Sequence, residues 1–89
     1  MIEPGYLDEM FDYMVDYNIK SVVVSPTSDG CRVTFDNGIW STGGRDLYSG
    51  ILKALVRGDK ITTVMGRMIN YGYSDNGDNG VSITLISYG

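Results

Sequence analysis

The sequence contains no histidine and a single cysteine, and these absences exclude several kinds of functional site. Without an imidazole there is no Ser-His-Asp triad and no histidine general base. A single thiol excludes an internal disulfide framework and leaves too few ligands for a structural zinc site within one chain. We therefore expect a protein that is not an enzyme and that needs no metal or other cofactor.

Long hydrophobic runs are also missing, and no stretch of the sequence reaches the 18 apolar residues or so that a membrane-spanning helix needs. The first residues, 1–5, lack the basic segment followed by a hydrophobic stretch that is typical of a secretion signal. With the lone Cys31, this predicts a cytoplasmic location and no membrane partner. The 89 residues, 43% of them hydrophobic, predict a single domain over residues 1–89.

Charge is unevenly distributed along the chain, which carries a net charge of -4. Residues 1–19 hold five acidic side chains and no basic one, whereas residues 45–67 hold five basic and two acidic side chains. Phosphate contacts dominate affinity for nucleic acids, so an acidic chain is a poor general nucleic-acid binder. We expect no direct binding of nucleic acid, and we expect a protein partner with a basic surface.

Three segments show the apolar spacing of an amphipathic helix. The first predicts a helix from about Tyr6 to Tyr17 and contains Leu7, Met10, Phe11, Met14 and Val15. The second begins with Asp46 as a plausible N-cap, ends at Gly58, and contains Leu47, Ile51, Leu52, Leu55 and Val56. The third predicts a helix over residues 61–69, although Thr62, Thr63 and Gly66 are poor helix formers, and the sequence leaves open whether residues 61–74 form helix, strand or both. A strand beginning near Asn70 is a further expectation.

Strands are predicted over residues 19–25, 31–35, 39–42 and 81–88. Asn37-Gly38 predicts a two-residue type I′ hairpin, which pairs Phe35 with Trp40 and places both on the core face beside Val33 and Cys31. The predicted fold is α+β: a two-layer sandwich with an antiparallel sheet of 4-5 strands and about three helices on one face. The expected order is α-β-β-β-α-α-(β)-β.

The first helix is the most informative segment for function. Tyr6, Met10, Tyr13 and Tyr17 fall beside its apolar group and widen the apolar and aromatic arc to roughly 200°, when a one-sided surface helix needs only about 100°. This surplus predicts either that the helix lies in a groove and contacts both the sheet and another helix, or that its tyrosine edge faces a partner. Tyrosine is enriched at interfaces because it has one apolar and one polar end. The candidate partner-binding residues are Tyr6, Asp8, Glu9, Asp12, Tyr13, Asp16 and Tyr17.

The carboxylates of this helix allow other hypotheses. They could imitate the phosphates of a nucleic acid and occupy a nucleic-acid-binding site, or Asp8, Asp12 and Asp16 could hold a hard cation. The segment Asp75–Gly80 invites a calcium interpretation, but it lacks the EF-hand pattern, since Gly77 and Ile86 stand where ligands belong. We interpret its two Asn-Gly pairs as turn residues.

A second constellation is Gly43-Gly44-Arg45, which precedes the second helix. Glycines let backbone N–H groups approach an anion, a helix N-terminus favours it, and Arg45 would add charge. This corner is the candidate ligand-binding site of an alternative function, a small-ligand module for an anionic metabolite or nucleotide. The strand pattern turns Cys31 inward, so we expect a small buried residue there and no nucleophile.

The leading hypothesis is a small acidic non-catalytic protein-interaction module, an inhibitor that binds and blocks a macromolecular partner. Its size and charge are typical of proteins that phages and other mobile elements use against host defence systems, including anti-CRISPR proteins, although this argument rests on class and not on a motif. A third hypothesis is a homo-oligomer, such as a homodimer, whose interface is the surplus surface of the first helix.

Overall fold

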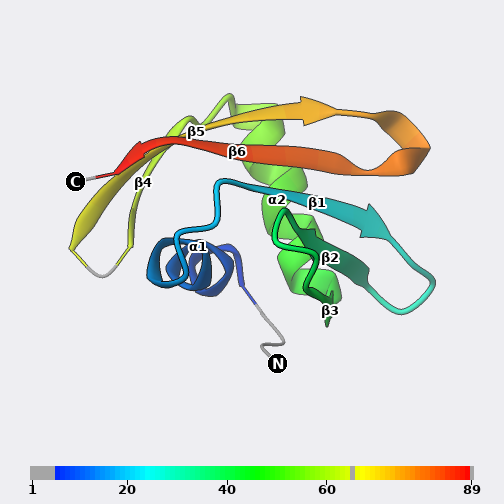
Figure 1. The fold of residues 1–89 in the computed structure, drawn as a ribbon. Coiled ribbons are helices and arrows are strands. Elements are labelled where there is room, and N and C mark those ends of the chain that lie inside the picture. Colours follow the sequence, from blue (N-terminus) through cyan, green and yellow to red (C-terminus); the bar gives the residue numbers. More distant parts are fainter. Residues whose placement is uncertain (1–5, 65, 89) are drawn as a thin grey trace.

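The computed structural model describes residues 6–64 and 66–88, which form an α+β fold of two layers (Figure 1). The elements in chain order are α1 (Leu7–Asp16), β1 (Ser21–Pro26), β2 (Cys31–Phe35), β3 (Trp40–Gly43), α2 (Arg45–Arg57), β4 (Ile61–Val64), β5 (Arg67–Asp75), the 3-10 helix η1 (Gly77–Asn79) and β6 (Val81–Tyr88). The predicted class is confirmed. The details differ, since the described residues form six strands and two α-helices, not 4-5 strands and three helices.

The six strands form one antiparallel sheet in the order β3-β2-β1-β6-β5-β4. The β2–β3 hairpin lies at one end of the sheet and the β4–β5 hairpin at the other, and β1 pairs with β6 in the middle. Both helices lie on the same side of this sheet (Figure 1). Their buried side chains join those of the strands in a single core cluster, so one face of the sheet is covered and the other is open.

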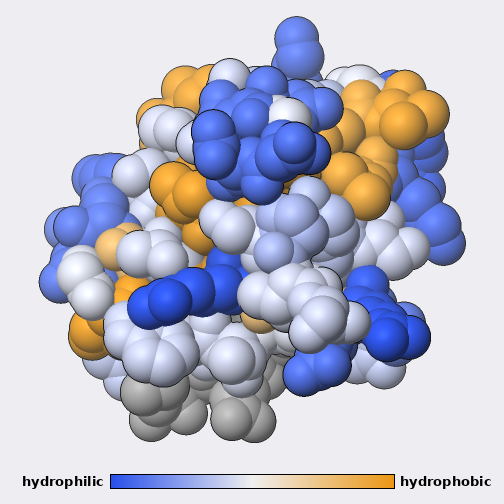
Figure 2. All heavy atoms as spheres, turned by 90° about the vertical axis from the view of Figure 1, so that its right-hand side faces the viewer, coloured by the Kyte–Doolittle hydropathy of each residue, from blue (hydrophilic) through white to orange (hydrophobic). Residues whose placement is uncertain are grey.

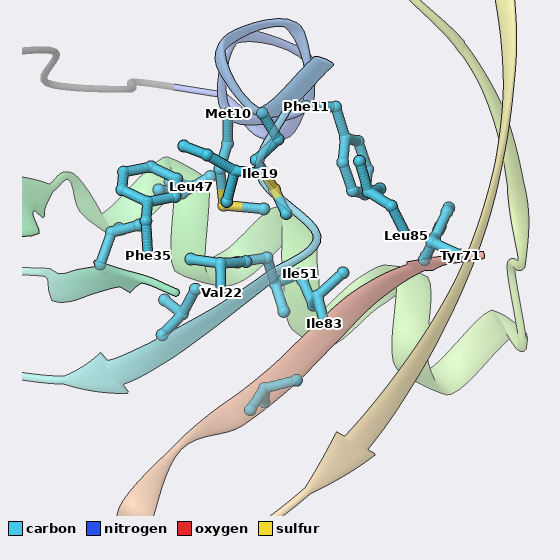
Figure 3. Packing of buried hydrophobic residues seen from close by; sticks show 14 of the residues in the cluster. Met10, Phe11, Ile19, Val22, Phe35, Leu47, Ile51, Tyr71, Ile83 and Leu85 are labelled. Atoms are coloured by element: carbon cyan, nitrogen blue, oxygen red, sulfur yellow. The ribbon is translucent and has the colours of Figure 1, made fainter. Parts of the chain in front are cut away.

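The core is a single cluster that extends from β2 through β1 and β6 to β5. Met10, Leu47 and Phe35 gather in one part of it, and Phe11 points toward Leu85 and Tyr71 in another (Figure 3). The Phe11 and Tyr71 rings have centroids 4.8 Å apart. Burial of side chains of this size contributes roughly 1.5–3 kcal/mol each relative to exposure, which anchors both helices on the sheet.

α1 follows the predicted apolar spacing, whereas α2 follows it only in part, because Leu47 and Ile51 are buried but Leu52 and Val56 are exposed. α1 buries Met10, Phe11, Met14 and Val15, as the sequence pattern requires. α2 begins one residue after Gly44, which serves as the N-cap in place of the predicted Asp46. α2 ends at Gly58, whose left-handed φ of 75° matches the predicted C-terminal glycine. Neither helix in the described part of the chain is long and apolar enough to span a bilayer.

The predicted register of the β2–β3 hairpin is wrong by one residue. Thr34 pairs with Trp40, and the loop has three residues, Asp36–Gly38, with Gly38 at a φ of 87°. The Gly38 N–H donates to the Phe35 carbonyl at 3.0 Å, so the loop is a type I turn closed by a glycine bulge. A shift of one residue moves every side chain to the other face. Trp40 therefore lies on the open face, and Ser41 is buried in its place.

The predicted helix over residues 61–69 is also wrong, because residues 61–64 and 67–75 form the paired strands β4 and β5. Val64 pairs with Arg67 and Gly66 has a φ of 79°, a conformation that glycine adopts without strain. Ile61 and Met68 are each 58% exposed, so the apolar residues do not share one buried face as a helix would require. The predicted strand near Asn70 is the second half of this hairpin, and Met65 lies outside the described residues.

Candidate protein-interaction surface

Four carboxylates lie along the side of α1 that faces away from the sheet. Asp8, Glu9 and Asp16 are exposed and Asp12 is half-buried, while the opposite side of the helix is in the core. We call Asp8, Glu9, Asp12 and Asp16 the carboxylate face. From Asp8 to Asp16 it extends over nine residues, a rise of about 12 Å at 1.5 Å per residue step. The structure thus places the predicted acidic residues on one accessible surface.

The predicted tyrosines of this helix are divided between surface and core. Tyr6 and Tyr17 are 62% and 66% exposed and lie at the two ends of α1. Tyr13 is half-buried, with its ring centroid 4.8 Å from that of Phe35 and 4.6 Å from that of Tyr17. Met10, from the same arc, is fully buried. Met10 and Tyr13, in the middle of the helix, therefore belong to the core or its edge. Tyr6 and Tyr17, at its ends, are the aromatic residues that a partner could reach.

The charges of α1 are arranged unfavourably for the helix itself. Asp8 and Glu9 in the first turn interact well with the helix dipole, but the last turn holds Asp16 and no basic residue. Asp8, Asp12 and Asp16 follow one another at spacings of four residues, where like charges repel by roughly 0.2–0.5 kcal/mol per pair. Within residues 6–64 and 66–88 none of these three aspartates forms an ion pair.

The carboxylates do not gather into a metal site. Across the described residues, no three His, Cys, Asp or Glu side chains come together in a way that could hold an ion. In the segment Asp75–Gly80 the polar groups serve the turn: the Gly77 N–H donates to Asp75 Oδ1 at 2.9 Å, and Asn76 Nδ2 donates to Ser82 Oγ at 2.9 Å. The interpretation of these residues as turn residues is confirmed.

The end of the molecule where the β1–β2 and β5–β6 turns lie is largely hydrophilic. Figure 2 shows hydrophilic side chains projecting from this end, with hydrophobic surface in separate areas beside them. The turns themselves therefore present polar groups at this end of the molecule.

The Gly43-Gly44-Arg45 corner has a packing role. A Cβ on Gly43 would lie 2.7 Å from both Cys31 Sγ and Leu47 Cδ2, so any side chain there would have to displace these two buried side chains between β2 and α2. Arg45 Nη2 donates to the Ser28 carbonyl at 3.4 Å and so joins α2 to the β1–β2 turn. Gly44 is exposed, with open space around it. Nothing in this geometry adds to the hypothesis of an anion site, which stays a prediction.

Cys31 is 1% exposed, which confirms the expected small buried residue. Its Sγ donates to the Gly44 carbonyl at 3.7 Å. Burial raises the pKa of this thiol, and a backbone hydrogen bond at Gly43 offsets part of the rise. The reactive thiolate form is therefore disfavoured at neutral pH.

One exposed feature was not predicted, because it follows from the register of the β2–β3 hairpin. Trp40 is 45% exposed on the open face of the sheet, and the Arg32 guanidinium carbon lies 4.3 Å from the centroid of its ring. This is a cation–π contact between neighbouring strands. The sequence feature that could have indicated the exposure of Trp40 is Gly38. This glycine suits the third position of a three-residue loop as well as the second position of a two-residue loop.

The described structure therefore offers two exposed surfaces that carry aromatic groups, the carboxylate face with Tyr6 and Tyr17, and the Arg32–Trp40 pair on the sheet. Only the first combines aromatic side chains with a charge of one sign along a whole helix. Comparisons of the chain with protein-family models, with curated proteins and with solved structures found no match.

Proposed function

We propose that the protein is a small non-catalytic interaction module that binds a basic surface of a protein partner through α1 and blocks it. The contact comprises the carboxylate face together with Tyr6 and Tyr17. Carboxylates along the helix steer a basic partner toward it, since complementary charge raises association rates. The exposed tyrosines add contact area with polar tips, as is common at interfaces.

The observation that carries this proposal is the unfavourable charge arrangement in α1. The repulsion among Asp8, Asp12 and Asp16, and the position of Asp16 at the negative end of the helix dipole, both lower the stability of the folded chain. Arrangements that break a local rule without a compensating contact tend to occur at functional sites. A basic partner supplies the missing compensation, because it neutralises the carboxylates when it binds.

The test is capture of a partner from the cell of origin by the tagged protein, compared between variants of equal charge. The variant Asp12→Lys/Asp16→Lys reverses half of the carboxylate face. The matched control Asp29→Lys/Asp78→Lys makes the same change in net charge at exposed aspartates outside α1. We expect one stoichiometric partner that the wild type and the control bind, and that the α1 variant binds at least tenfold more weakly.

Two outcomes would contradict the proposal. Equal loss of the partner in the α1 variant and in the control would mean that net charge, and not this surface, determines binding. Full retention in the α1 variant would remove α1 from the interface. Inhibition is tested with the purified partner, whose activity should fall in proportion to the added protein up to one equivalent. The narrower expectation of a phage or mobile-element protein against host defence, such as an anti-CRISPR, stays a prediction.

A further inference from the structure

A second surface lies on the outward side of α2. An open groove of about 300 Å³ is lined there by Ser49, Leu52, Lys53, Val56 and Arg57. Val56 is 89% exposed and Leu52 is 40% exposed, and four-residue spacing places this aliphatic pair in a row beside the cationic pair Lys53 and Arg57. We call these five residues the α2 groove. From Ser49 to Arg57 it extends over nine residues, a rise of about 12 Å, which equals that of the carboxylate face.

The two surfaces are chemically complementary. The carboxylate face offers Asp12 and Asp16 with the Tyr17 ring beside them, and the α2 groove offers cations with an aliphatic floor. The Lys53 side chain forms no hydrogen bond or ion pair with any other residue in the described ranges. Arg57 is paired with Asp59 at 3.0 Å but keeps an exposed side chain. The two surfaces therefore carry opposite charges.

Within one molecule the two surfaces cannot meet. Both helices bury one side in the same core and cover the same face of the sheet, so their opposite sides both point away from the sheet. In Figure 1, α1 is seen end-on below the strands and α2 runs from top to bottom behind them, so the two helices cross one another. A second copy that approaches the outward sides of the helices brings the surfaces together. A two-fold axis places α1 of each copy on α2 of the other, so both complementary contacts form at once and the assembly is closed.

We infer that two copies of the chain associate through their helix layers, with the carboxylate face of each in contact with the α2 groove of the other. The molecule measures 35 × 30 Å across its two long directions, which leaves room for the roughly 800 Å² that each partner contributes to a stable interface. In this dimer the carboxylate face is covered. One consequence rests on the proposed function: the second copy then competes with the basic partner for the carboxylate face and limits binding at high protein concentration.

The test uses charge reversal on each surface in the purified full chain, with mass measured by light scattering and sedimentation and with no other partner present. Wild-type protein should pass from monomer to dimer as its concentration rises. The dimer should weaken when salt rises from about 0.1 M to 1 M, because the screening length falls from about 10 Å to about 3 Å. The variants Asp12→Lys/Asp16→Lys and Lys53→Glu/Val56→Glu should each be monomeric at concentrations where the wild type is dimeric.

Mixing the two reversed variants is the decisive step. One variant then carries cations on both surfaces and the other carries carboxylates on both, so each contact of the two-fold dimer is attractive again. We expect a 1:1 heterodimer at least as stable as the wild-type dimer. Circular dichroism of each variant verifies that loss of the dimer is not loss of the fold.

Three results would overturn the inference: a wild-type chain that stays monomeric at millimolar concentration, reversed variants that do not restore one another, or a dimer that survives both reversals but is lost in Trp40→Ala. The last result would place the interface on the open face of the sheet. None of these results bears on capture of a basic partner by the carboxylate face, so failure of the dimer and failure of the proposed function can be told apart.

Discussion

The ring of Tyr13 lies against the ring of Phe35, with centroids 4.8 Å apart and planes inclined by 51°. This contact joins α1 to β2 on one side of the helix. On the other side Phe11 meets Tyr71 of β5, also at 4.8 Å. The two aromatic pairs hold α1 across the sheet from both sides, and so they determine which residues of α1 belong to the core and which are available to a partner.

We predict that Tyr13→Ala destabilises the fold whereas Tyr17→Ala does not. Loss of the half-buried Tyr13 ring removes the contact with Phe35 and should lower the free energy of unfolding by about 1–3 kcal/mol. Tyr17 is 66% exposed, and its replacement should change this free energy by less than about 0.5 kcal/mol. Urea denaturation of both variants measures the difference. Similar midpoints for the two would contradict the division between core and surface tyrosines.

A second prediction follows from the position of Asp16 at the last turn of α1. Lysine there interacts favourably with the negative end of the helix dipole and removes the repulsion with Asp12. We expect Asp16→Lys to raise the free energy of unfolding by about 0.3–1 kcal/mol at low salt. Under the proposed function the same change weakens partner binding, so stability and binding should move in opposite directions.

The matched control for Asp16→Lys is Asp8→Lys, at the other end of the same helix. Asp8→Lys relieves the same kind of repulsion with Asp12, but Asp8 lies in the first turn, where a carboxylate is favourable and a lysine is not. The free energy of unfolding of Asp8→Lys should therefore be lower than that of Asp16→Lys. This difference should shrink as salt is added, since surface electrostatics is screened. Equal changes in the two variants would show that net charge, and not position in the helix, is responsible.

Much of α1 and α2 could be predicted because a helix repeats its pattern over three turns or more. Met10, Phe11, Met14 and Val15 are buried as their spacing requires, and Gly58 ends α2 with a positive φ. The exposure of the carboxylate face follows from the same periodicity. The half-burial of Tyr13 could not be predicted from this periodicity, because it depends on contact with Phe35. Phe35 is distant in sequence, and only the folding of the sheet brings it to α1.

The open face of the sheet could not be predicted, because strand register depends on a single turn. Asn37-Gly38 suits two loops that differ by one residue, and the choice between them decides whether Trp40 or Ser41 is buried. Residues 61–69 failed for a different reason. Their apolar side chains have helical spacing, but Ile61 and Met68 are exposed while Ile69 is buried, so the spacing does not reflect one buried face. The β-branched Thr62 and Thr63 and the positive φ of Gly66 favour the hairpin.

A third prediction concerns Gly43 and Gly44, which are adjacent in sequence but differ in surroundings. Gly43→Ala brings a methyl group to 2.7 Å from Cys31 Sγ and Leu47 Cδ2, so it should lower the free energy of unfolding by about 1–3 kcal/mol. A methyl group on Gly44 meets no atom within 4 Å, and this residue has a φ of -79° that alanine tolerates. Gly44→Ala should therefore be nearly neutral. Thermal denaturation compares the two, and a neutral Gly43→Ala would contradict the close packing of α2 on β2.

The last prediction is a loss of stability at alkaline pH that depends on Tyr71. Burial, with the negative charge of Asp59 as the next cause, raises the pKa of Tyr71 above its ordinary value of about 10. The folded protein then holds this proton more tightly than the unfolded chain does. The corresponding stability is complete below about pH 10 and is lost as pH rises through the folded-state pKa.

Replacement of the phenol isolates this contribution. Tyr71→Phe keeps the ring that packs on Phe11 but has no proton to lose, so its free energy of unfolding should fall less steeply above about pH 10 than that of the wild type. Denaturant titrations at pH 8 to 11 measure both slopes. Because the remaining titrating groups are common to both proteins, parallel slopes would show that the Tyr71 hydroxyl is as well solvated in the folded state as in the unfolded chain. A steeper wild-type slope would confirm that folding excludes the charged phenolate from the site between α1 and β5.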